Sequence, residues 1–410
     1  MGNLSSKKSS VRPRTESLLV VLVAAVILFI RKTDSILNPQ FWAEDGTVFF
    51  LDQYHDGVSS IFQPVAGYLM VVPRIIAFLA DLLFSVPAAP YVYNYLSLII
   101  TLLVVVSIYS PRLIMGNKAL LALTIVLVPH VTNEIFLTAN NTQWILTLLI
   151  LITLLKEPPH KKYGDIFIQA FCDFLVIIIC GLTGPFIVFS IPFFVWKLIS
   201  EKSRYYFSLF LVALVTSLIQ LSIIASHLFS QSSESEYDVV EPLAAIVGQK
   251  FFGGLFLGSS IPYKINAFFL CFLLFCLCIL LAYLSAGDKR RKFKIATFMG
   301  FSTILLLATF YKFKFNLYVL IPPANGPRYF YIPYVMTVWS LIACIDLRRK
   351  WKSTVIKVLL VIVLISSLTS GFRSHFIDLD WQSYGKLIGK EQNLIIPINP
   401  WGWAIDMRQN

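Results

Sequence analysis

Long apolar runs separated by short polar stretches repeat along the chain from Ser17 to Gly371. A helix needs about 20 mostly apolar residues to cross a bilayer, and many windows of this chain meet that length. The runs predict spans at about 16–30, 91–110, 118–131, 143–156, 166–181, 185–199, 205–228, 266–285, 295–311, 329–346 and 354–370. The expected fold is an all-α polytopic membrane protein with about 11 transmembrane helices.

Two apolar segments need separate interpretation. The first, "SLLVVLVAAVILFI", follows basic residues as a signal peptide does, but no small-residue cleavage site comes after it. We therefore expect a retained first span. The segment 67–85 is expected to lie on the outer face of the membrane or to dip into it, as a juxtamembrane helix of the first outer loop, residues 31–90.

Composition and charge fix the class and the orientation. Of the 410 residues, 57% are hydrophobic and 14% are charged, whereas a soluble domain has roughly 25% charged residues. With a cytosolic N-terminus, the cytosolic segments hold 22 of the 34 Lys and Arg and six acids, and the outer segments hold 12 Lys and Arg and fifteen acids. This is the usual bias of polytopic proteins. The basic residues orient helices and meet anionic lipid, so the net charge of +12 requires no nucleic-acid partner.

The six cysteines fall inside or beside apolar runs and lack metal-ligand spacing, so we interpret them as small core residues. Asp173 is the one acid expected within a span.

Nearly all polar motifs fall on the outer side, where loops carried by rigid helices concentrate binding and catalysis. We divide the chain into a transmembrane domain, 1–370, and an outer tail, 371–410. In the first outer loop, "FWAEDG" places Glu44 beside Asp45. Such a carboxylate can take a proton from a hydroxyl as it attacks a sugar carbon, and the like charge beside it would raise one of the two pKa values. The alternative is a solvated acidic loop, which does not call for the flanking Trp42 and Gly46.

Three other outer motifs are candidates for ligand contacts. "NGPRYFY" puts Arg328 at a helix start, where a guanidinium suits a phosphate, or it reaches lipid headgroups instead. "TANNTQW" joins three amides to a Trp, as in sugar recognition, or forms a helix cap with an interfacial Trp. "NPWGW" brings Trp401 and Trp403 either to the membrane interface or over the carboxylate loop, as a cap that excludes water.

The order of these parts resembles the C-type (GT-C) membrane glycosyltransferases, such as the protein O-mannosyltransferases and the aminoarabinose transferases acting on lipid A. "AEDG" takes the place of their acidic motif, "QPVAGYLMVVPR" that of the juxtamembrane helix, and "YVYNYLSLIITLLVVVSIYSPRLIMGNK" that of the next span and its basic turn. "WAEDG" with "GPRY" is also similar to O-antigen glucosyltransferase-like bacterial membrane proteins. The likeness covers roughly the first 160 residues; Glu precedes Asp here, and "PVAG" lacks a second proline.

The resemblance implies a glycosyltransferase of the bacterial inner membrane whose active site faces the periplasm. The sugar would come from a polyprenyl-phosphate donor and go to a hydroxyl of a glycan or lipid acceptor. Asp45 would activate that hydroxyl, with Glu44 positioning or sharing the proton, and a divalent ion (Mg or Mn) at this pair stays open. Further partners implied are the bilayer, a small flippase and a donor-synthesising glycosyltransferase.

The same resemblance implies two groups of ligand-binding residues. The donor phosphate would be held by Arg328 and Tyr329, with Arg74 as a second candidate. The sugar and the acceptor would contact Trp42, His55, Tyr68, Asn140, Asn141, Gln143, Trp401 and Trp403.

Other functions stay open. A flippase or transporter would carry midplane charges or repeated halves, and the chain shows only Asp173 and no repeat. A glycan polymerase or ligase would use arginines in large outer loops, whereas the loop 229–265 has none. An O-acyltransferase would want a membrane His, and the five histidines form no motif. No P-loop or G-x-G-x-x-G motif is present, which fits a lipid-linked donor.

Overall fold

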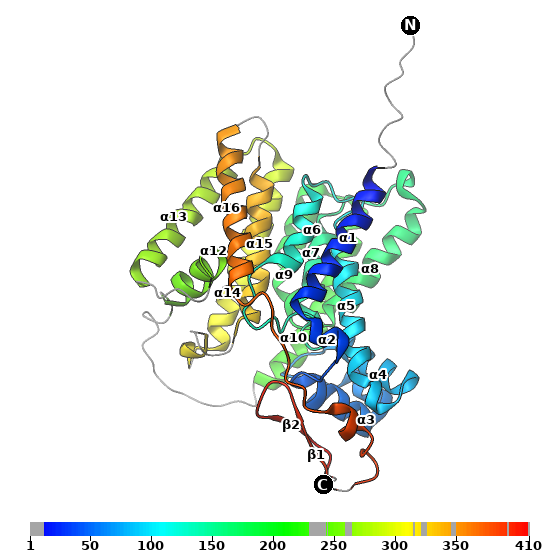
Figure 1. Ribbon diagram of the computed structural model, residues 1–410. Helices are drawn as coiled ribbons and strands as arrows, with labels where there is room; N and C mark the ends of the chain where they lie inside the picture. The colour runs from blue at the N-terminus through cyan, green and yellow to red at the C-terminus, as the bar shows by residue number, and fades with distance from the viewer. Residues whose placement is uncertain are drawn as a thin grey trace. The chain divides into compact units, whose positions relative to one another are not determined.

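The chain is mostly helical in the computed structural model, which describes residues 12–228, 243, 245–258, 265–314, 316–320, 326–345, 350–391 and 393–408 (Figure 1). It divides into two compact units. Unit 1 consists of Met1–Ile27, Val105–Asn133 and Ser233–Phe372, and unit 2 consists of Leu28–Val104, Glu134–Ser232 and Arg373–Asn410. Each unit is described separately below.

Two helices cross the division between the units along the chain, α1 (Arg12–Arg31) and α5 (Ala89–Ser107). The other elements of unit 1 are α6 (Lys118–Leu127), η5 (Ile246–Gly253), α12 (Gly254–Phe256), α13 (Ile265–Leu284), α14 (Lys289–Lys312), η6 (Leu317–Leu320), α15 (Arg328–Cys344) and α16 (Lys350–Thr369). Those of unit 2 are α2 (Thr33–Leu37), η1 (Asp45–Phe50), α3 (Leu51–Asp56), η2 (Gly57–Phe62), α4 (Val71–Leu83), η3 (Val86–Ala88), α7 (Thr142–Leu155), η4 (Lys161–Tyr163), α8 (Ile166–Gly181), α9 (Phe186–Glu201), α10 (Arg204–Leu228), α17 (Trp381–Gly385), β1 (Ile395–Ile398) and β2 (Trp403–Asp406).

A helix covers most of each of the eleven segments predicted as spans. Among the described residues, three helices are long and apolar enough to cross a membrane: Val86–Ser107, Arg204–His227 and Lys289–Lys312. Others are shorter. Helix α7 has 14 residues, or about 21 Å at 1.5 Å per residue, less than the roughly 30 Å of a hydrocarbon core. The structure therefore shows a helical protein with candidate spans, and the total of about eleven stays a prediction.

Unit 1 packs around α15, which is buried along nearly its whole length. Tyr331 donates its hydroxyl hydrogen to the carbonyl of Ile125 at 2.8 Å, and the Trp339 indole donates to the carbonyl of Leu121 at 3.0 Å. Both acceptors lie on α6. Phe298 of α14 meets the Trp339 ring edge-on at 5.5 Å. The polar atoms of these large side chains are thus satisfied inside the apolar core.

The interpretation of all six cysteines as core residues is wrong for part of the set. Cys180 and Cys344 are buried, but Cys172, Cys271 and Cys278 are exposed. The exposed ones lie on α8 and α13, two strongly apolar helices whose outward surface is itself apolar. A small apolar side chain is therefore tolerated there as well as inside.

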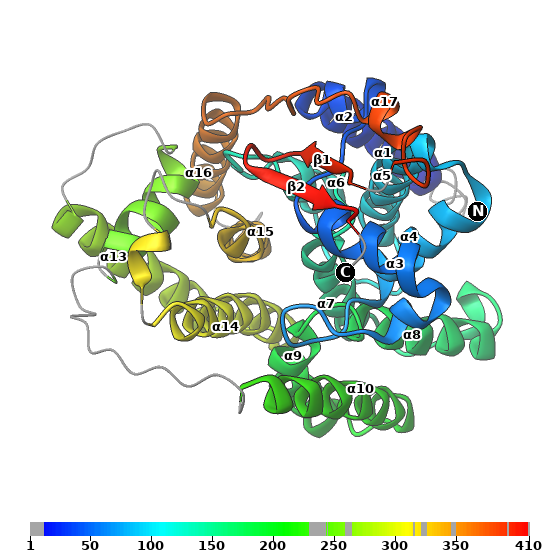
Figure 2. The same ribbon diagram turned by 90° about the horizontal axis from the view of Figure 1, so that it is seen from below.

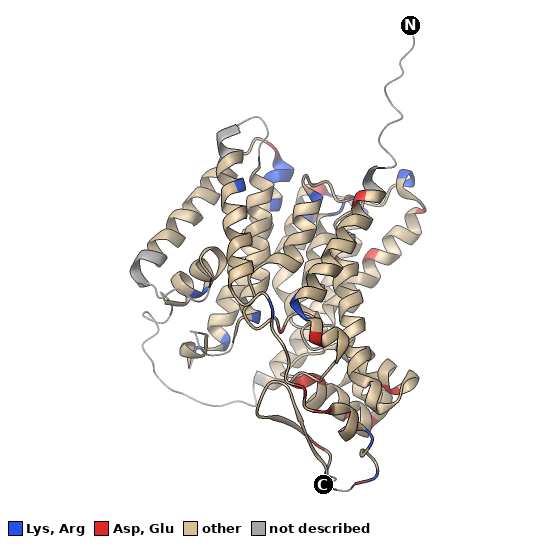
Figure 3. Ribbon diagram, in the orientation of Figure 1, with Lys and Arg blue, Asp and Glu red and all other residues tan. Residues whose placement is uncertain are grey.

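Unit 2 gathers its short elements at one end. Figures 1 and 2 show α3, α4 and the β1–β2 hairpin at the same end of α5 and α8, with β2 beside the start of α3. Acidic positions on α2, η1, α3 and α4 lie at this end (Figure 3). The predicted juxtamembrane segment 67–85 contains the helix α4 there. The loop with Glu44 and Asp45, the segment 67–85 and the tail hairpin therefore meet in one region of unit 2, whereas "NGPRYFY" belongs to unit 1.

The only strands among the described residues are β1 and β2, which pair antiparallel with Ile396 opposite Ile405. Ile396, Ile398 and Ile405 are buried, with exposed fractions of 3% or less. A two-stranded hairpin has little stability of its own, so this one depends on the surface that its isoleucines cover.

Candidate functional site

The two adjacent carboxylates follow a tight turn. Asp45 donates its N–H to the carbonyl of Trp42 at 2.8 Å, and Ala43 has a φ of +41°. A left-handed conformation is uncommon for a residue other than glycine and costs on the order of 1 kcal/mol. The π-helix η1 begins directly after the turn. Both features are frequent at functional sites.

Asp45 is buried and held by a second loop. Its side chain is 1% exposed, and its two oxygens accept the backbone N–H groups of Ala139 at 2.9 Å and Asn140 at 2.6 Å. Burial raises the pKa of Asp45 to about 7, the two N–H groups oppose this shift, and the charge of Glu44 adds to it. Asp45 therefore titrates near neutral pH while it ties two loops together.

Glu44 occupies a different environment. It is half-buried, and its Oε2 accepts a hydrogen bond from the Asn140 side-chain amide at 2.9 Å. Asn140 thus contacts both acids, Asp45 through its backbone and Glu44 through its side chain. The predicted neighbours Glu44, Asp45 and Asn140 come together in the structure.

The other two amides of "TANNTQW" turn inward. Asn141 is fully buried and donates to the Glu134 carbonyl at 2.8 Å and to the Thr138 hydroxyl at 3.0 Å. Gln143 is 4% exposed and donates to the Asn140 carbonyl at 3.3 Å. These two side chains shape the loop that holds Asp45, so the sugar contact expected of them lacks an exposed amide.

A buried glutamine that the sequence prediction missed joins two further outer motifs. Gln220 of α10 is fully buried, and its Nε2 donates to the carbonyls of Leu69, Gly181 and Gly184 at 3.1 to 3.2 Å. Its Oε1 accepts the Leu69 N–H at 3.0 Å. One amide therefore fixes "PVAGYLM" against "GLTGPF". A glutamine inside a long apolar run is the signal that could have identified it.

Arg74, the second phosphate candidate, is already engaged. It is fully buried, its Nη1 lies 2.8 Å from Asp52 Oδ2, and its guanidinium lies 5.2 Å from the ring centroid of Phe49. Its charge is thus compensated inside the protein. Two other predicted residues lie close by in the chain: His55 is exposed beside Tyr54, and Tyr68 is half-buried in a turn with Val65.

Arg328 and Tyr329 belong to unit 1, so their surroundings are described apart from those of Glu44 and Asp45. Arg328 is half-buried at the start of α15, with its guanidinium 5.7 Å from the Tyr329 ring centroid. Lys312 donates to the Tyr329 hydroxyl at 3.0 Å. Two cations thus share one tyrosine. Asn325 of "NGPRYFY" and residues 321–324 before it lie outside the described residues.

The outer tail packs on the carboxylate loop. Asn399 donates its N–H to the Phe41 carbonyl at 3.2 Å, and its own carbonyl accepts the Ala43 N–H. A Cβ on Gly46 would lie 2.8 Å from the Cδ1 atoms of both Ile398 and Ile405. Asn399 had no signal in the sequence beyond its place in an Asn-Pro turn. The hairpin therefore rests directly on η1.

The predicted tryptophans of the site are in three different situations. Trp42 stacks on Phe376 of the tail at 4.8 Å. Trp401, in the hairpin turn, is 80% exposed, and Trp403 is 39% exposed. Both tail indoles are thus accessible to a sugar or to lipid. The sugar contact of Trp401 and Trp403 stays a prediction.

The residues present fit a divalent ion poorly. Both oxygens of Asp45 already accept N–H groups, and among the described residues no group of three or more His, Cys, Asp or Glu could hold a metal. Glu44 is the one acid of the pair with an exposed side-chain surface.

Comparison with known proteins adds no assignment to this geometry. No protein-family model, no curated protein and no solved structure matches the chain.

Proposed function

We propose that this chain is a membrane glycosyltransferase of the GT-C type. It would move a sugar from a polyprenyl-phosphate donor to a hydroxyl of a glycan or lipid acceptor at the outer face of the bacterial inner membrane. The observation that carries the proposal is the pair of adjacent carboxylates held in different environments by one residue. Glu44 is half-buried and bonded to the Asn140 side chain, whereas Asp45 is buried against its backbone.

The proposal gives the two acids different roles. A general base must come within hydrogen-bond reach of the proton that it removes. Glu44 has an exposed surface, whereas Asp45 is 1% exposed and has both oxygens bonded to N–H groups. Glu44 is thus the base and Asp45 a positioning residue that holds the loop, the reverse of the sequence expectation.

The transfer step then involves one proton and two bonds. The acceptor hydroxyl gives its proton to the Glu44 carboxylate as its oxygen bonds to the anomeric carbon of the sugar. The bond from that carbon to the phosphate oxygen breaks, and polyprenyl phosphate leaves as an anion. The charge of Glu44 favours the protonated form of the neighbouring Asp45.

The helical fold supports this proposal at a coarser level. The proposed topology has about eleven spans, a cytosolic N-terminus and a periplasmic site. The proposed partners are the bilayer, a flippase and a donor-synthesising enzyme. Arg328 and Tyr329 remain candidates for the donor phosphate. Lys312 also contacts Tyr329, which would add positive charge beside it.

A transporter is less well supported. Its main sequence argument was Asp173, and this carboxylate is bonded to Lys156 at 3.0 Å and to the Tyr205 hydroxyl at 2.7 Å. A carboxylate with a fixed cation suits a structural role better than a moving proton. The loop 229–265, which bears on a polymerase or ligase, lies partly outside the described residues, at 229–242, 244 and 259–264.

The test is Glu44→Gln, which keeps the oxygen that accepts from Asn140 but removes the base. Membranes containing the protein are incubated with polyprenyl-phosphate hexoses labelled in the sugar, and label entering membrane glycans is measured. Loss of a general base lowers the rate about 10²–10⁴-fold, and we expect a fall in that range.

Asp56→Asn is the matched control. Asp56 lies in the same loop and accepts from a side-chain amide, that of Gln63, at 2.9 Å, but it is exposed and lies at the end of α3. This variant should transfer sugar at the wild-type rate. Equal transfer by the wild type and Glu44→Gln, or equal loss in both variants, would refute the role of Glu44.

A further inference from the structure

Two basic residues are buried together at the end of α1. Arg31 and Lys32 each have an exposed fraction of 0%. Buried charges in proteins are normally paired or hydrogen-bonded, because removing an ion from water costs several kcal/mol. The guanidinium of Arg31 lies 4.7 Å from the ring centroid of Phe136. The adjacent lysine is the more unusual of the two.

The ammonium of Lys32 has no hydrogen-bond acceptor. It lies over the ring of Phe376, whose centroid is 3.2 Å from Nζ. A cation–π contact offsets only part of the cost of burying an ammonium. Burial accordingly lowers the pKa of Lys32 to about 7, with the charge of Asp34 opposing the shift.

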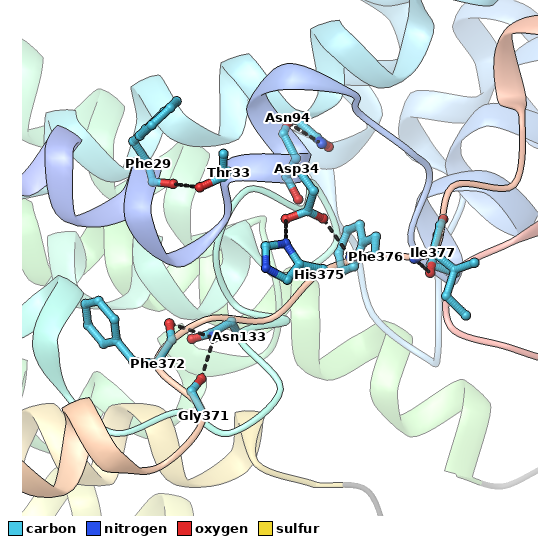
Figure 4. Close-up of polar contacts among 12 residues, drawn as sticks. Phe29, Thr33, Asp34, Asn94, Asn133, Gly371, Phe372, His375, Phe376 and Ile377 are labelled. Atoms are coloured by element: carbon cyan, nitrogen blue, oxygen red, sulfur yellow. Dashed lines mark hydrogen bonds and ion pairs between the residues drawn. The ribbon is translucent and has the colours of Figure 1, made fainter.

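Asp34 is the nearest candidate to neutralise Lys32, but its oxygens face the tail. Oδ2 accepts the Phe376 N–H at 2.7 Å, and Oδ1 lies 3.5 Å from Nδ1 of His375, as Figure 4 shows. Asp34 is therefore the charged group that acts on the ammonium, while its own oxygens are engaged by the tail. The three donors of the lysine remain without an oxygen acceptor.

The surroundings of Lys32 are shared with the carboxylate site. Phe376, which covers the ammonium, also stacks on Trp42, two residues before Glu44. Phe136, beneath Arg31, belongs to the loop whose residue Asn140 holds both acids. The buried cations therefore border the same two segments that position Glu44.

We propose that Lys32, with Arg31 beside it, binds the phosphate of a lipid-linked phosphate. A phosphate supplies both the negative charge and the oxygen acceptors that the ammonium lacks, and charge-assisted bonds of this kind are the stronger ones. Phe376 lies in residues 371–380, which contain no helix or strand, so its ring can give way to the anion. The inference rests on the proposed function, because the lipid-linked phosphate would be the sugar donor of that reaction.

This position is better suited to the phosphate than the second candidate of the sequence. Arg74 already has a carboxylate, that of Asp52, at 2.8 Å. Binding a phosphate there would first require that ion pair to break. Lys32 has no such pair, and a phosphate would replace only the cation–π contact with the Phe376 ring.

The experiment uses the whole protein in phosphatidylcholine nanodiscs and measures its Tm with one of three additions. These are a polyprenyl phosphate, the same mole fraction of phosphatidylglycerol, and inorganic phosphate in the buffer. A ligand that binds the native state raises Tm. We expect the polyprenyl phosphate to raise the Tm of the wild type, and Lys32→Met to need at least about tenfold more of it for the same rise.

Lys118→Met is the matched control, because the ammonium of Lys118 already donates to the Ser110 carbonyl at 2.7 Å. This variant should keep the wild-type response. Without any addition, Lys32→Met should be at least as stable as the wild type, since it removes a buried charge without a partner. A variant that is destabilised and still responds fully to polyprenyl phosphate would show a structural lysine and overturn the proposal.

The three additions separate the sources of the phosphate. A rise with phosphatidylglycerol that Lys32→Met abolishes supports the site but assigns it to a lipid headgroup, and the same result with inorganic phosphate assigns it to a free anion. No Lys32-dependent rise with any of the three overturns the site. Glu44→Gln should respond like the wild type, so a failed transfer assay would refute the proposed function and leave this binding result standing.

Discussion

Unit 2 contains two buried aspartates that are stabilised in different ways. Asp173 has a cation and a hydroxyl, Lys156 at 3.0 Å and Tyr205 at 2.7 Å. Asp45 has two backbone N–H groups, and among the described residues no lysine or arginine forms an ion pair with it. The first arrangement fixes a charge, whereas the second leaves the carboxyl free to gain or lose a proton near neutral pH.

The comparison separates an acid with a fixed cation from one that the proposed function places beside the reacting groups. Lys156, at the end of α7, pairs with Asp173 of α8, and its carbonyl accepts the hydroxyl of Tyr206 from α10 at 3.0 Å. That group holds three helices together. Asp45 instead joins two loops next to a half-buried carboxylate, Glu44. Burial alone would have classed the two aspartates together.

Removing Lys156 should give the largest effect on stability. Lys156→Met leaves the Asp173 carboxylate buried without its cation, which typically costs about 3–5 kcal/mol. Thermal unfolding in detergent measures the loss, and the double variant Lys156→Met/Asp173→Leu should recover much of it. A loss below about 1 kcal/mol would remove the contrast between the two aspartates.

Asp45→Asn should cost less. The asparagine offers one oxygen to two N–H groups and turns its own NH₂ toward the other, so one buried donor loses its acceptor. Such a loss costs about 1–3 kcal/mol. The same unfolding assay, with Asp56→Asn as an exposed control expected to stay within about 0.5 kcal/mol, checks the value. Equal stability of Asp45→Asn and the wild type would show that the two N–H bonds do not anchor the loop.

The free energies of unfolding of the wild type and of Asp45→Asn should also depend differently on pH. The folded-state pKa of Asp45 is raised from 3.8 to about 7, so its contribution to stability is complete below pH 3.8 and is lost as the pH rises through 7. The stability gap between the wild type and Asp45→Asn should therefore be largest near pH 4 and shrink by pH 8. A gap that grows over this range would contradict burial as the dominant cause of the shift.

The smallest effect is expected at the contact between η1 and the hairpin. A Cβ on Gly46 meets two Ile Cδ1 atoms at 2.8 Å, and these flexible ends can move. We expect Gly46→Ala to cost about 1 kcal/mol and to speed cleavage of the tail by an added protease. Gly287→Ala, where an added Cβ meets nothing, is the control. Unchanged cleavage in Gly46→Ala would mean that the hairpin does not rest on this glycine.

Much of the fold followed from the sequence because long apolar runs leave few choices. The run predicted at 205–228 is α10 (Arg204–Leu228), and that at 166–181 is α8 with the same bounds. Which helices cross a membrane did not follow with equal certainty, because several apolar helices are only 10–17 residues long. The final length of each helix and its tertiary packing decide whether it can cross a membrane. The local pattern of apolar residues predicts neither of these two properties.

The acid pair was predicted from its motif, but the different surroundings of Glu44 and Asp45 were not. Asp45 is buried by bonds to residues 94 and 95 positions later in the chain. No local pattern reports such a partner. For the same reason the sequence indicated Arg74 as a positive charge but did not indicate that it forms an ion pair with Asp52. Gln220 was missed because its three carbonyl partners come from two other loops.

The bonds between the first loop and the tail also determine when, during synthesis, the site can form. Gln40 pairs with Asp378 across 338 positions, and Asp34 accepts the Phe376 N–H across 342. At about 5–20 residues per second, a ribosome needs roughly 20 s to a minute to add that much chain. Until then the first loop lacks the tail residues that bond to it. Under the proposed function, a partly made chain would carry the acid pair but no finished site, and sugar transfer could begin only once the tail has been made.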